Sequence, residues 1–234
     1  MSSGVVDLKK EQEASLLRPR YPYSLSARFF FALMDLLVGK KTTLAKTKLI
    51  ELLASIPYRA WEHRQYVRMT RRYASWNLVR QAFSLMNWSR EAQDNEFKHL
   101  LVIEEKMKED GVKNPWFLFP PIPWAMCMSY ALICYLTALF SIRRAILFNA
   151  EFEDHAEHVY AQFVKDNPQW EDKPVRSGRV GIYGQFDNWA DVFRRIGLDE
   201  RDHMNTSFYY ADRPDCIVHY EGMPPLEEPE ANED

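Results

Sequence analysis

Apolar residues recur along the chain at helical spacing, which predicts a protein built from long amphipathic helices. One such pattern runs from Thr43 to about Arg72 and contains Pro57, which should kink the helix. A second pattern covers roughly residues 77–109, with a break expected near Asn87. These two segments alone indicate helices longer than those of an average globular protein.

Two further helices are expected next, followed by a loop and a last helix. Residues 124–165 predict two helices that meet near Ser141, and a loop with proline and glycine spans about 166–187. Asp187 is expected to cap the last helix, which continues through NWADVFRRIGLDERDHMNTSFYY. The sequence therefore predicts an all-α chain.

The two ends of the chain differ in composition from the segments between them. Residues 1–22 are polar and then broken by prolines, so we expect a flexible N-terminal arm. The acidic stretch 213–234 should be disordered. Residues 23–212 form the expected helical domain, and its first helix, in SLSARFFFALMDLLVG, begins after Ser24 or Ser26 and stops at Gly39.

Two apolar segments indicate contact with a membrane. The run Pro115–Ile142 has no charged residue, but its prolines leave only about 19 residues before Arg143. That length permits a transmembrane span. The alternative is an interfacial helix that dips into one leaflet together with the phenylalanine-rich helix near residue 30.

Composition and charge exclude some classes of protein. The 234 residues carry a net charge of −3, so nothing indicates a nucleic-acid partner. The three cysteines have no CxxC spacing, and we interpret them as reduced thiols, not as a disulfide framework or a zinc site. The N-terminal segment carries acids and lacks the apolar core of a signal peptide.

Two Glu-x-x-His pairs are the strongest indication of chemistry. Glu96 and His99 form one pair, Glu200 and His203 form the other, and each pair falls inside an expected helix. Residues three apart share a helical face, so each pair can bind one cation. Carboxylate bundles that hold two irons need two such pairs and one further glutamate from each of two other helices.

The two further glutamates can be sought on the remaining helices. The helix that starts at Thr43 offers Glu51 and Glu62, and Glu51 has apolar neighbours that disfavour a solvated acid. The other candidate is Glu153. The order along the chain is then one glutamate, one Glu-x-x-His pair, a second single glutamate and the second pair. Such a set of four carboxylates and two imidazoles suits a pair of iron ions.

The stretch EFEDHAEHVY, residues 151–160, has two faces on a helical wheel. Glu153 shares one face with Tyr160, whereas Glu151, His155 and His158 lie roughly opposite and are expected on a solvated face. Tyr160 is seven residues after Glu153, close to two turns, and a tyrosine there can supply an electron and a proton.

Tyr58 lies seven residues after Glu51, so it is expected on the same helical face as Glu51. Its alternative role is packing within a layer of the bundle.

These motifs resemble the alternative oxidase family, and more closely its plastid terminal oxidase (plastoquinol oxidase) branch. The similar segments are IELLASIPYRA, DNEFKHLLVIEE, FEDHAEHVYAQF and DVFRRIGLDERDH, and the resemblance covers about residues 28–210. It implies a ferritin-like four-helix di-iron bundle with additional membrane-surface helices, bound to one leaflet as a monotopic protein. It also implies a quinol oxidase of an electron-transport chain that reduces O2 to water without pumping protons.

The resemblance implies roles for single residues. The iron ligands would be Glu51, Glu96, His99, Glu153, Glu200 and His203, and Tyr160 would be the redox-active tyrosine. Asn95, Asp199 and Tyr58 would orient ligands by hydrogen bonds. Near the quinol, Lys46 stands where the family has arginine, and Val159 stands where it has threonine.

The implied partners are a quinol (plastoquinol or ubiquinol), O2, a lipid bilayer and a second copy of the chain in a homodimer. A thylakoid or prokaryotic membrane is favoured, and a mitochondrial inner membrane is also compatible. Two other functions remain open on the same residues. One is a di-iron hydroxylase or desaturase of a lipid-like substrate, because the ligand set is shared. The other is a non-catalytic helical subunit of a membrane complex.

Overall fold

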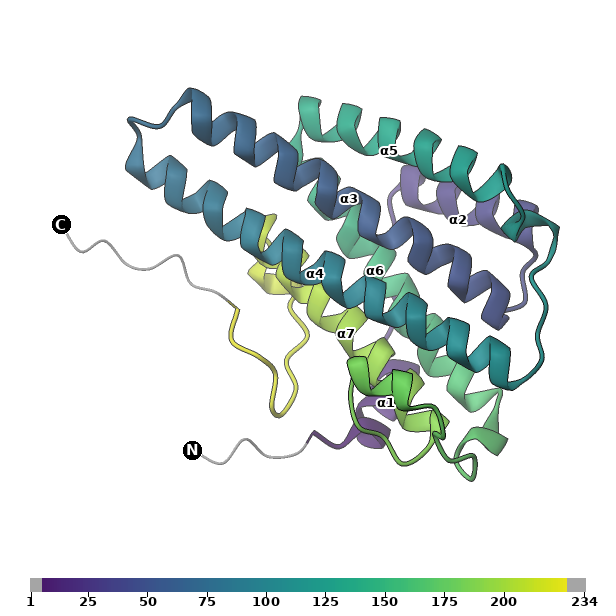
Figure 1. Cartoon of the computed structure of the whole chain (residues 1–234). Helices are drawn as coiled ribbons and strands as arrows, with labels where there is room; N and C mark the ends of the chain where they lie inside the picture. Colours follow the sequence, from purple (N-terminus) through teal and green to yellow (C-terminus); the bar gives the residue numbers. More distant parts are fainter. Residues whose placement is uncertain (1–5, 227–234) are drawn as a thin grey trace.

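The computed structural model describes residues 6–226 and is all-helical, as the sequence predicts. Its four longest helices are α3 (Leu44–Arg71), α4 (Trp76–Glu109), α6 (Ile142–Lys165) and α7 (Trp189–Tyr210). α3 packs lengthwise on α4 and α6 packs lengthwise on α7, so two antiparallel helix pairs lie side by side (Figure 1). Short 3-10 turns occupy Trp116–Leu118, Pro168–Trp170, Gly178–Ile182 and Pro214–Cys216.

The helix boundaries confirm some of the predicted signals and correct others. α5 (Ile122–Phe140) and α6 meet at Ser141, whose side chain caps α6 by accepting from the backbone N–H of Arg144. α4 continues unbroken through Asn87, so the predicted break is wrong. The last helix is capped by Asn188, not Asp187, because the Asn188 side chain accepts from Asp191 N–H.

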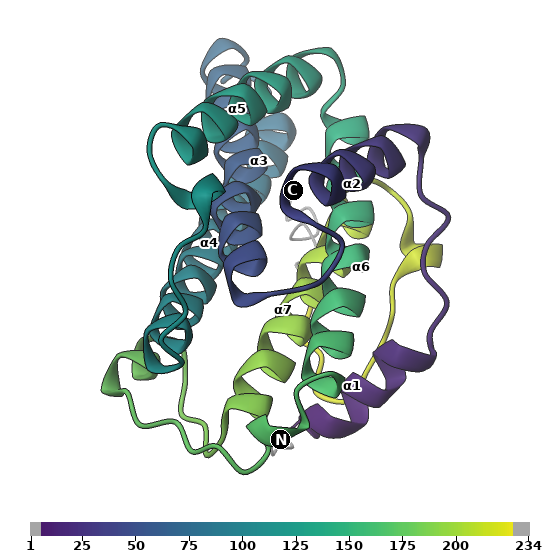
Figure 2. The ribbon, with the colours of Figure 1, turned by 90° about the vertical axis from the view of Figure 1, so that its right-hand side faces the viewer.

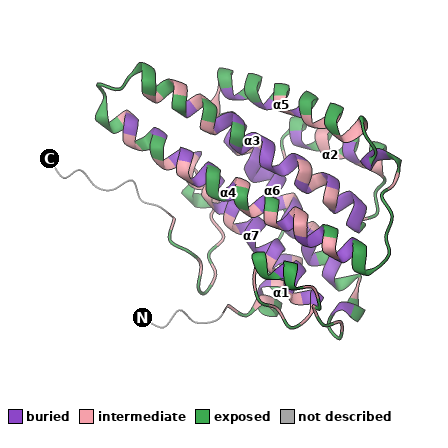
Figure 3. Cartoon of the chain, in the orientation of Figure 1, coloured by how far each residue is buried: buried purple, intermediate pink, exposed green. Residues whose placement is uncertain are grey.

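Buried side chains concentrate between the two helix pairs (Figure 3). α3 remains helical through Pro57, and its buried face carries Tyr58 and Trp61; Trp61 stacks on Trp88 of α4, and Tyr58 meets Trp88 edge-to-face. On the other pair, Phe193 of α7 packs against Trp170 with ring centroids 4.5 Å apart. These large aromatic residues fix the spacing of the four helices and thereby the positions of polar groups between them.

Two apolar helices lie outside this core on one side of the molecule. α2 (Leu25–Val38) runs from its Ser24 cap to Gly39 as predicted, and α5 lies near it (Figures 1 and 2). Phe30 of α2 meets Tyr130 of α5 at 5.5 Å between ring centroids. Among the described helices, α5 is the one long and apolar enough to cross a membrane, and most of its residues are not buried.

The N-terminal segment is not a flexible arm within the described residues. Residues Leu8–Leu17 form α1, which packs on α6 and α7 (Figure 2). The buried guanidinium of Arg201 on α7 binds Glu11 of α1 at 2.5 Å and Glu157 of α6 at 2.9 Å. Sequence spacing could not show this, because the partners lie up to 190 residues apart.

The same contacts overturn the expected solvated face of α6. Asp154 and Glu157 are fully buried, and Arg18 binds them at 2.7 and 2.6 Å. Glu151 accepts hydrogen bonds from Ser24, and His158 lies against the carbonyl of Arg18 at 2.9 Å. Residues 11–24 therefore cover the face that appeared to be exposed.

The prediction of a disordered C-terminal tail is wrong for residues 213–226. Val218 exchanges two backbone hydrogen bonds with the side chain of Asn205, and Tyr220 donates to Asp202 at 2.7 Å. These contacts hold residues 213–226 against α7. The remainder of the predicted disordered tail, 227–234, lies outside the described residues.

Candidate metal centre

Six acidic and imidazole side chains from the four long helices converge at the middle of the bundle. All six are buried, with exposed fractions between 0% and 7%. They are the predicted ligands Glu51 of α3, Glu96 and His99 of α4, Glu153 of α6, and Glu200 and His203 of α7. The structure thus brings together residues that are up to 152 positions apart in the sequence.

The six residues form two overlapping groups. One group is Glu51, Glu96, His99 and Glu200, and the other is Glu96, Glu153, Glu200 and His203; within each group the ligand atoms lie within 4.8 Å of one another. Glu96 and Glu200 belong to both. A carboxylate has two oxygens, so each shared glutamate can face two neighbouring cations at once. The two groups could each hold a cation, and Glu96 and Glu200 would be available to both.

The atoms facing this space have no hydrogen-bond partner. Glu51 Oε2, both carboxylate oxygens of Glu96, His99 Nδ1, Glu153 Oε2 and His203 Nδ1 are buried and make no hydrogen bond of good geometry, although His203 Nδ1 lies 2.9 Å from Glu96 Oε1 and His99 Nδ1 lies 3.4 Å from Glu51 Oε2. Buried polar atoms are almost always paired, because an unpaired one keeps its full desolvation penalty. A cluster of such atoms directed at one centre is the state expected of ligands around a cation.

Burial raises the pKa of most of the carboxyl groups. It raises the pKa of Glu51 to about 8, partly offset by His99, and likewise raises the pKa of Glu200 to about 8. The pKa of Glu153 lies well above its usual value because of burial and the nearby charge of Glu200. Without a cation, these groups cannot all be ionised in one dry space.

The pKa values of the remaining groups, Glu96, His99 and His203, shift in the direction that favours ion pairs between them. Burial would raise the pKa of Glu96, but His203 and His99 outweigh it and hold that pKa below its usual value. Burial would lower the pKa of His203, but Glu96 outweighs it and raises that pKa. Two divalent cations would balance the four carboxylates and leave both imidazoles neutral, so the donor set fits two such ions.

Asp199 orients the imidazole of His99. His99 Nε2 lies 3.1 Å from Asp199 Oδ2, which leaves Nδ1 facing the centre. Asp199 also accepts from Tyr183 at 2.5 Å, from Arg195 at 2.7 Å and from Asn95 at 3.3 Å. Asn95 and Asp199, both predicted to orient ligands, thus belong to one hydrogen-bond network that ends at His99. Tyr183 and Arg195 were missed, because neither stands beside a ligand in the sequence.

Tyr58 and Asn149 position Glu153. The hydroxyl of Tyr58 donates to Glu153 Oε1 at 2.8 Å, and Asn149 donates to the same oxygen at 2.9 Å. Asn149 also contacts Ser207 of α7 at 3.3 Å. With Oε1 held in this way, Oε2 is left free to face the centre.

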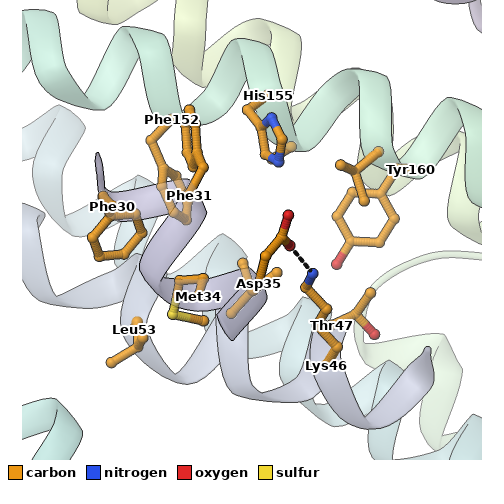
Figure 4. A pocket seen from close by; sticks show the side chains of 13 residues that line it. Phe30, Phe31, Met34, Asp35, Lys46, Thr47, Leu53, Phe152, His155 and Tyr160 are labelled. Carbon is orange, nitrogen blue, oxygen red and sulfur yellow. Dashed lines mark hydrogen bonds and ion pairs between the residues drawn. The ribbon is translucent and has the colours of Figure 1, made fainter. Parts of the chain in front are cut away.

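Tyr160 connects the centre to a second feature, an apolar pocket. Its hydroxyl donates a hydrogen bond to Glu51 Oε1. Gly197 of α7 allows this placement, since a Cβ there would stand only 3.2 Å from the Cβ of Tyr160. The other side of the tyrosine ring lines the pocket (Figure 4).

The pocket lies between α2, α3 and α6 and is mainly apolar (Figure 4). Its polar groups are few, and the central ones are Asp35 and Lys46, which form an ion pair at 2.7 Å. Val159 is part of the wall, as the prediction for Lys46 and Val159 requires. His155 also lines it and stacks on Phe31 with centroids 4.1 Å apart, so its predicted solvent position is wrong.

A third group of possible ligands, Asp154, Glu157 and His158, is fully occupied by protein partners. Asp154 accepts from Arg18, Tyr21 N–H and Tyr23, while Glu157 accepts from Arg18, Ser15 and Arg201. Nothing is left unpaired here. The stretch 151–160 therefore contributes one ligand to the central cluster and a structural ion-pair network on its other face.

Comparison with known proteins adds no assignment, because no protein-family model and no curated protein matches this chain.

Proposed function

We propose that this protein is a di-iron quinol oxidase with a ferritin-like bundle, attached to one leaflet of a membrane. The observation that carries the proposal is the pair of overlapping ligand groups with Glu96 and Glu200 in common, beside a pocket that reaches Tyr160. The resemblance to alternative oxidases supports the same reading. Iron is favoured because carboxylates and imidazoles together suit it.

The reaction would take four electrons and four protons from two quinols and yield two quinones and two waters from one O2. The bound iron pair would supply the electron storage and the O2 activation. The protein residues would hold and transfer protons. The Tyr160 hydroxyl donates a hydrogen bond to Glu51, so the side chain lies between the pocket and the cluster; it could give an electron and its phenolic proton toward the cluster and regain both from a quinol in the pocket.

The mainly apolar lining of the pocket suits a quinol, but the pocket is too small for one. A ring would stack against Phe31 and His155, with its hydroxyl groups near Lys46 and Asp35. The free volume of about 40 Å³ is far below that of pockets occupied by drug-sized ligands. Binding therefore requires α2 to shift, and α2 buries only Ala27 and Met34.

Membrane attachment would place the pocket where quinols are found. α2 lines the pocket and exposes Leu25, Phe29 and Leu36 on its outer side, with exposed fractions of 71–82%. α5 lies near α2 and exposes a further apolar surface. A quinol dissolved in one leaflet would then enter beside α2 without crossing water.

The direct test is oxygen uptake by the iron-loaded, detergent-solubilised protein after addition of a short-chain quinol. We expect uptake by the wild type, its loss in Glu153→Gln, and its retention in Glu104→Gln, which alters an exposed glutamate of α4. Iron binding without quinol-dependent uptake would refute the oxidase and favour the hydroxylase or desaturase. Neither iron nor uptake would favour the non-catalytic subunit.

The quinol pocket is tested by Lys46→Gln. Loss of this cation should raise the KM for quinol while iron content stays unchanged, because Lys46 lines the pocket but is not a ligand. Lys48→Gln is the matched control, since Lys48 pairs with Glu104 at the surface. Equal KM values in both variants would place the quinol elsewhere.

A further inference from the structure

A second cavity, unrelated to the metal centre, lies between the C-terminal halves of α3 and α5. Its volume is about 700 Å³. One wall carries four arginines of α3 and its C-terminal end, and the other is formed by Tyr135, Leu136 and Leu139 of α5. The arginines are Arg64, Arg68, Arg71 and Arg72. We refer to this cavity as the arginine groove.

The positive charge of the arginine groove is not compensated within residues 6–226. Among the described residues, no acid lines the groove and none of its four arginines forms an ion pair. The nearest acid in the sequence, Glu62, is engaged by Arg90 at 2.7 Å. Burial and the charge of Arg68 lower the pKa of Arg64, whose Nε atom is buried without a partner. Four like charges along one wall make the groove attractive to an anion.

The opposite wall of the arginine groove is apolar and continues into the outer surface of α5. Leu139 is 63% exposed and the adjacent Phe140 is 85% exposed. A free phosphate would satisfy the arginines but leave this wall in water. A neutral quinol or acyl chain would cover the wall but leave the arginines uncompensated. An anionic phospholipid would place its phosphate against the arginines and an acyl chain against the apolar wall.

Exposed aromatic residues lie next to the arginines. Tyr73 and Trp76, at the turn between α3 and α4, are 70% and 62% exposed. Tyrosine and tryptophan favour the headgroup level of a bilayer, where one part of the ring is apolar and another is polar. Their position indicates that the α3–α4 turn lies at the same depth as lipid phosphates.

We propose that the arginine groove binds one anionic phospholipid, with its phosphate among the arginines and an acyl chain along Leu136 and Leu139. This inference rests on the membrane attachment proposed above but not on the oxidase chemistry. It adds a lipid selectivity: α2 and α5 would bind any bilayer, whereas the groove would favour a negatively charged one.

The test is sedimentation of the full chain with vesicles of phosphatidylcholine, with or without phosphatidylglycerol. Arg64→Gln/Arg71→Gln should lower the partition coefficient onto the phosphatidylglycerol vesicles by roughly tenfold and leave binding to pure phosphatidylcholine unchanged. Lys40→Gln/Lys41→Gln is the control, because it removes the same charge from exposed residues at the end of α2. Thermal unfolding midpoints confirm that each variant is folded.

Three outcomes would overturn the proposal. Equal losses in the two double variants would show diffuse attraction by basic residues instead of a groove. Wild-type binding that does not depend on phosphatidylglycerol would remove the selectivity. Absence of any vesicle binding would refute the membrane attachment as well. Iron content and quinol-dependent oxygen uptake, measured on the same samples, report separately on the oxidase.

Discussion

Tyr160 donates its hydroxyl hydrogen bond to Glu51, and its ring forms part of the wall of the apolar pocket. One side chain thus separates the pocket proposed for a quinol from the cluster of buried carboxylates and imidazoles. Burial and the charge of Glu51 raise the pKa of Tyr160 well above its ordinary value, so the phenol stays protonated across the physiological range.

Replacing Tyr160 by phenylalanine tests this position. We expect quinol-dependent oxygen uptake to fall at least about 100-fold, as for loss of a proton-transfer group, with iron content unchanged. Tyr58→Phe is the comparison, because Tyr58 also donates to a cluster carboxylate but does not line the pocket. Equal activity of the two variants would deny Tyr160 a special role.

Asp199 should control metal affinity without binding metal itself. Asp199→Asn removes the charge that holds His99, so the affinity for ferrous ion should fall by about 10- to 100-fold. Asp202→Asn is the control on the same helix, since Asp202 binds Arg195 and Tyr220. Anaerobic ferrous titration measures both. Unchanged affinity in Asp199→Asn would mean that His99 is not oriented by this contact.

The metal-free protein should lose stability as the pH rises from about 4.5 to about 8. Glu51 and Glu200 have folded-state pKa values of about 8, well above those of exposed glutamates, and burial is the main cause. A raised folded-state pKa contributes stability that is complete below the unfolded-state pKa and is lost as the pH passes the folded-state value.

Urea unfolding of the metal-free protein at several pH values measures this effect. Bound iron should abolish the decline, because the cation takes the place of the protons and binds more tightly at higher pH. A metal-free protein that becomes more stable as the pH rises from about 5 to about 8 would contradict the clustering of these carboxyl groups.

The buried Arg201 should be a major contributor to stability. Arg201→Met leaves Glu11 without its guanidinium and weakens the pairing of Glu157, so the free energy of unfolding should fall by about 3 kcal/mol. The exposed Arg176→Gln serves as the control. A loss below about 1 kcal/mol would mean that α1 is not anchored through this residue.

The ligand cluster could be predicted from the sequence because its signals are local. Glu96 and His99 are one helical turn apart, and Glu51 stands among apolar neighbours, so each signal depends only on helix periodicity. Four helices of suitable length then bring such residues to a common centre.

The outer face of α6 could not be predicted in this way. Glu151 and His158 resemble residues of a solvated helix, and contacts with Ser24 and Arg18, at distant positions, account for their burial. The helical wheel gives the direction of each side chain but not what covers it. The same limit applies to α1, whose composition is polar and whose attachment depends on ion pairs.

The most direct test of the account is the number of iron ions bound per chain. After anaerobic loading and removal of free metal, the wild type should hold two, and Glu96→Gln should hold fewer because Glu96 belongs to both ligand groups. The exposed Glu104→Gln should still hold two. One ion or none in the wild type, or two retained in Glu96→Gln, would contradict a dinuclear centre at these residues.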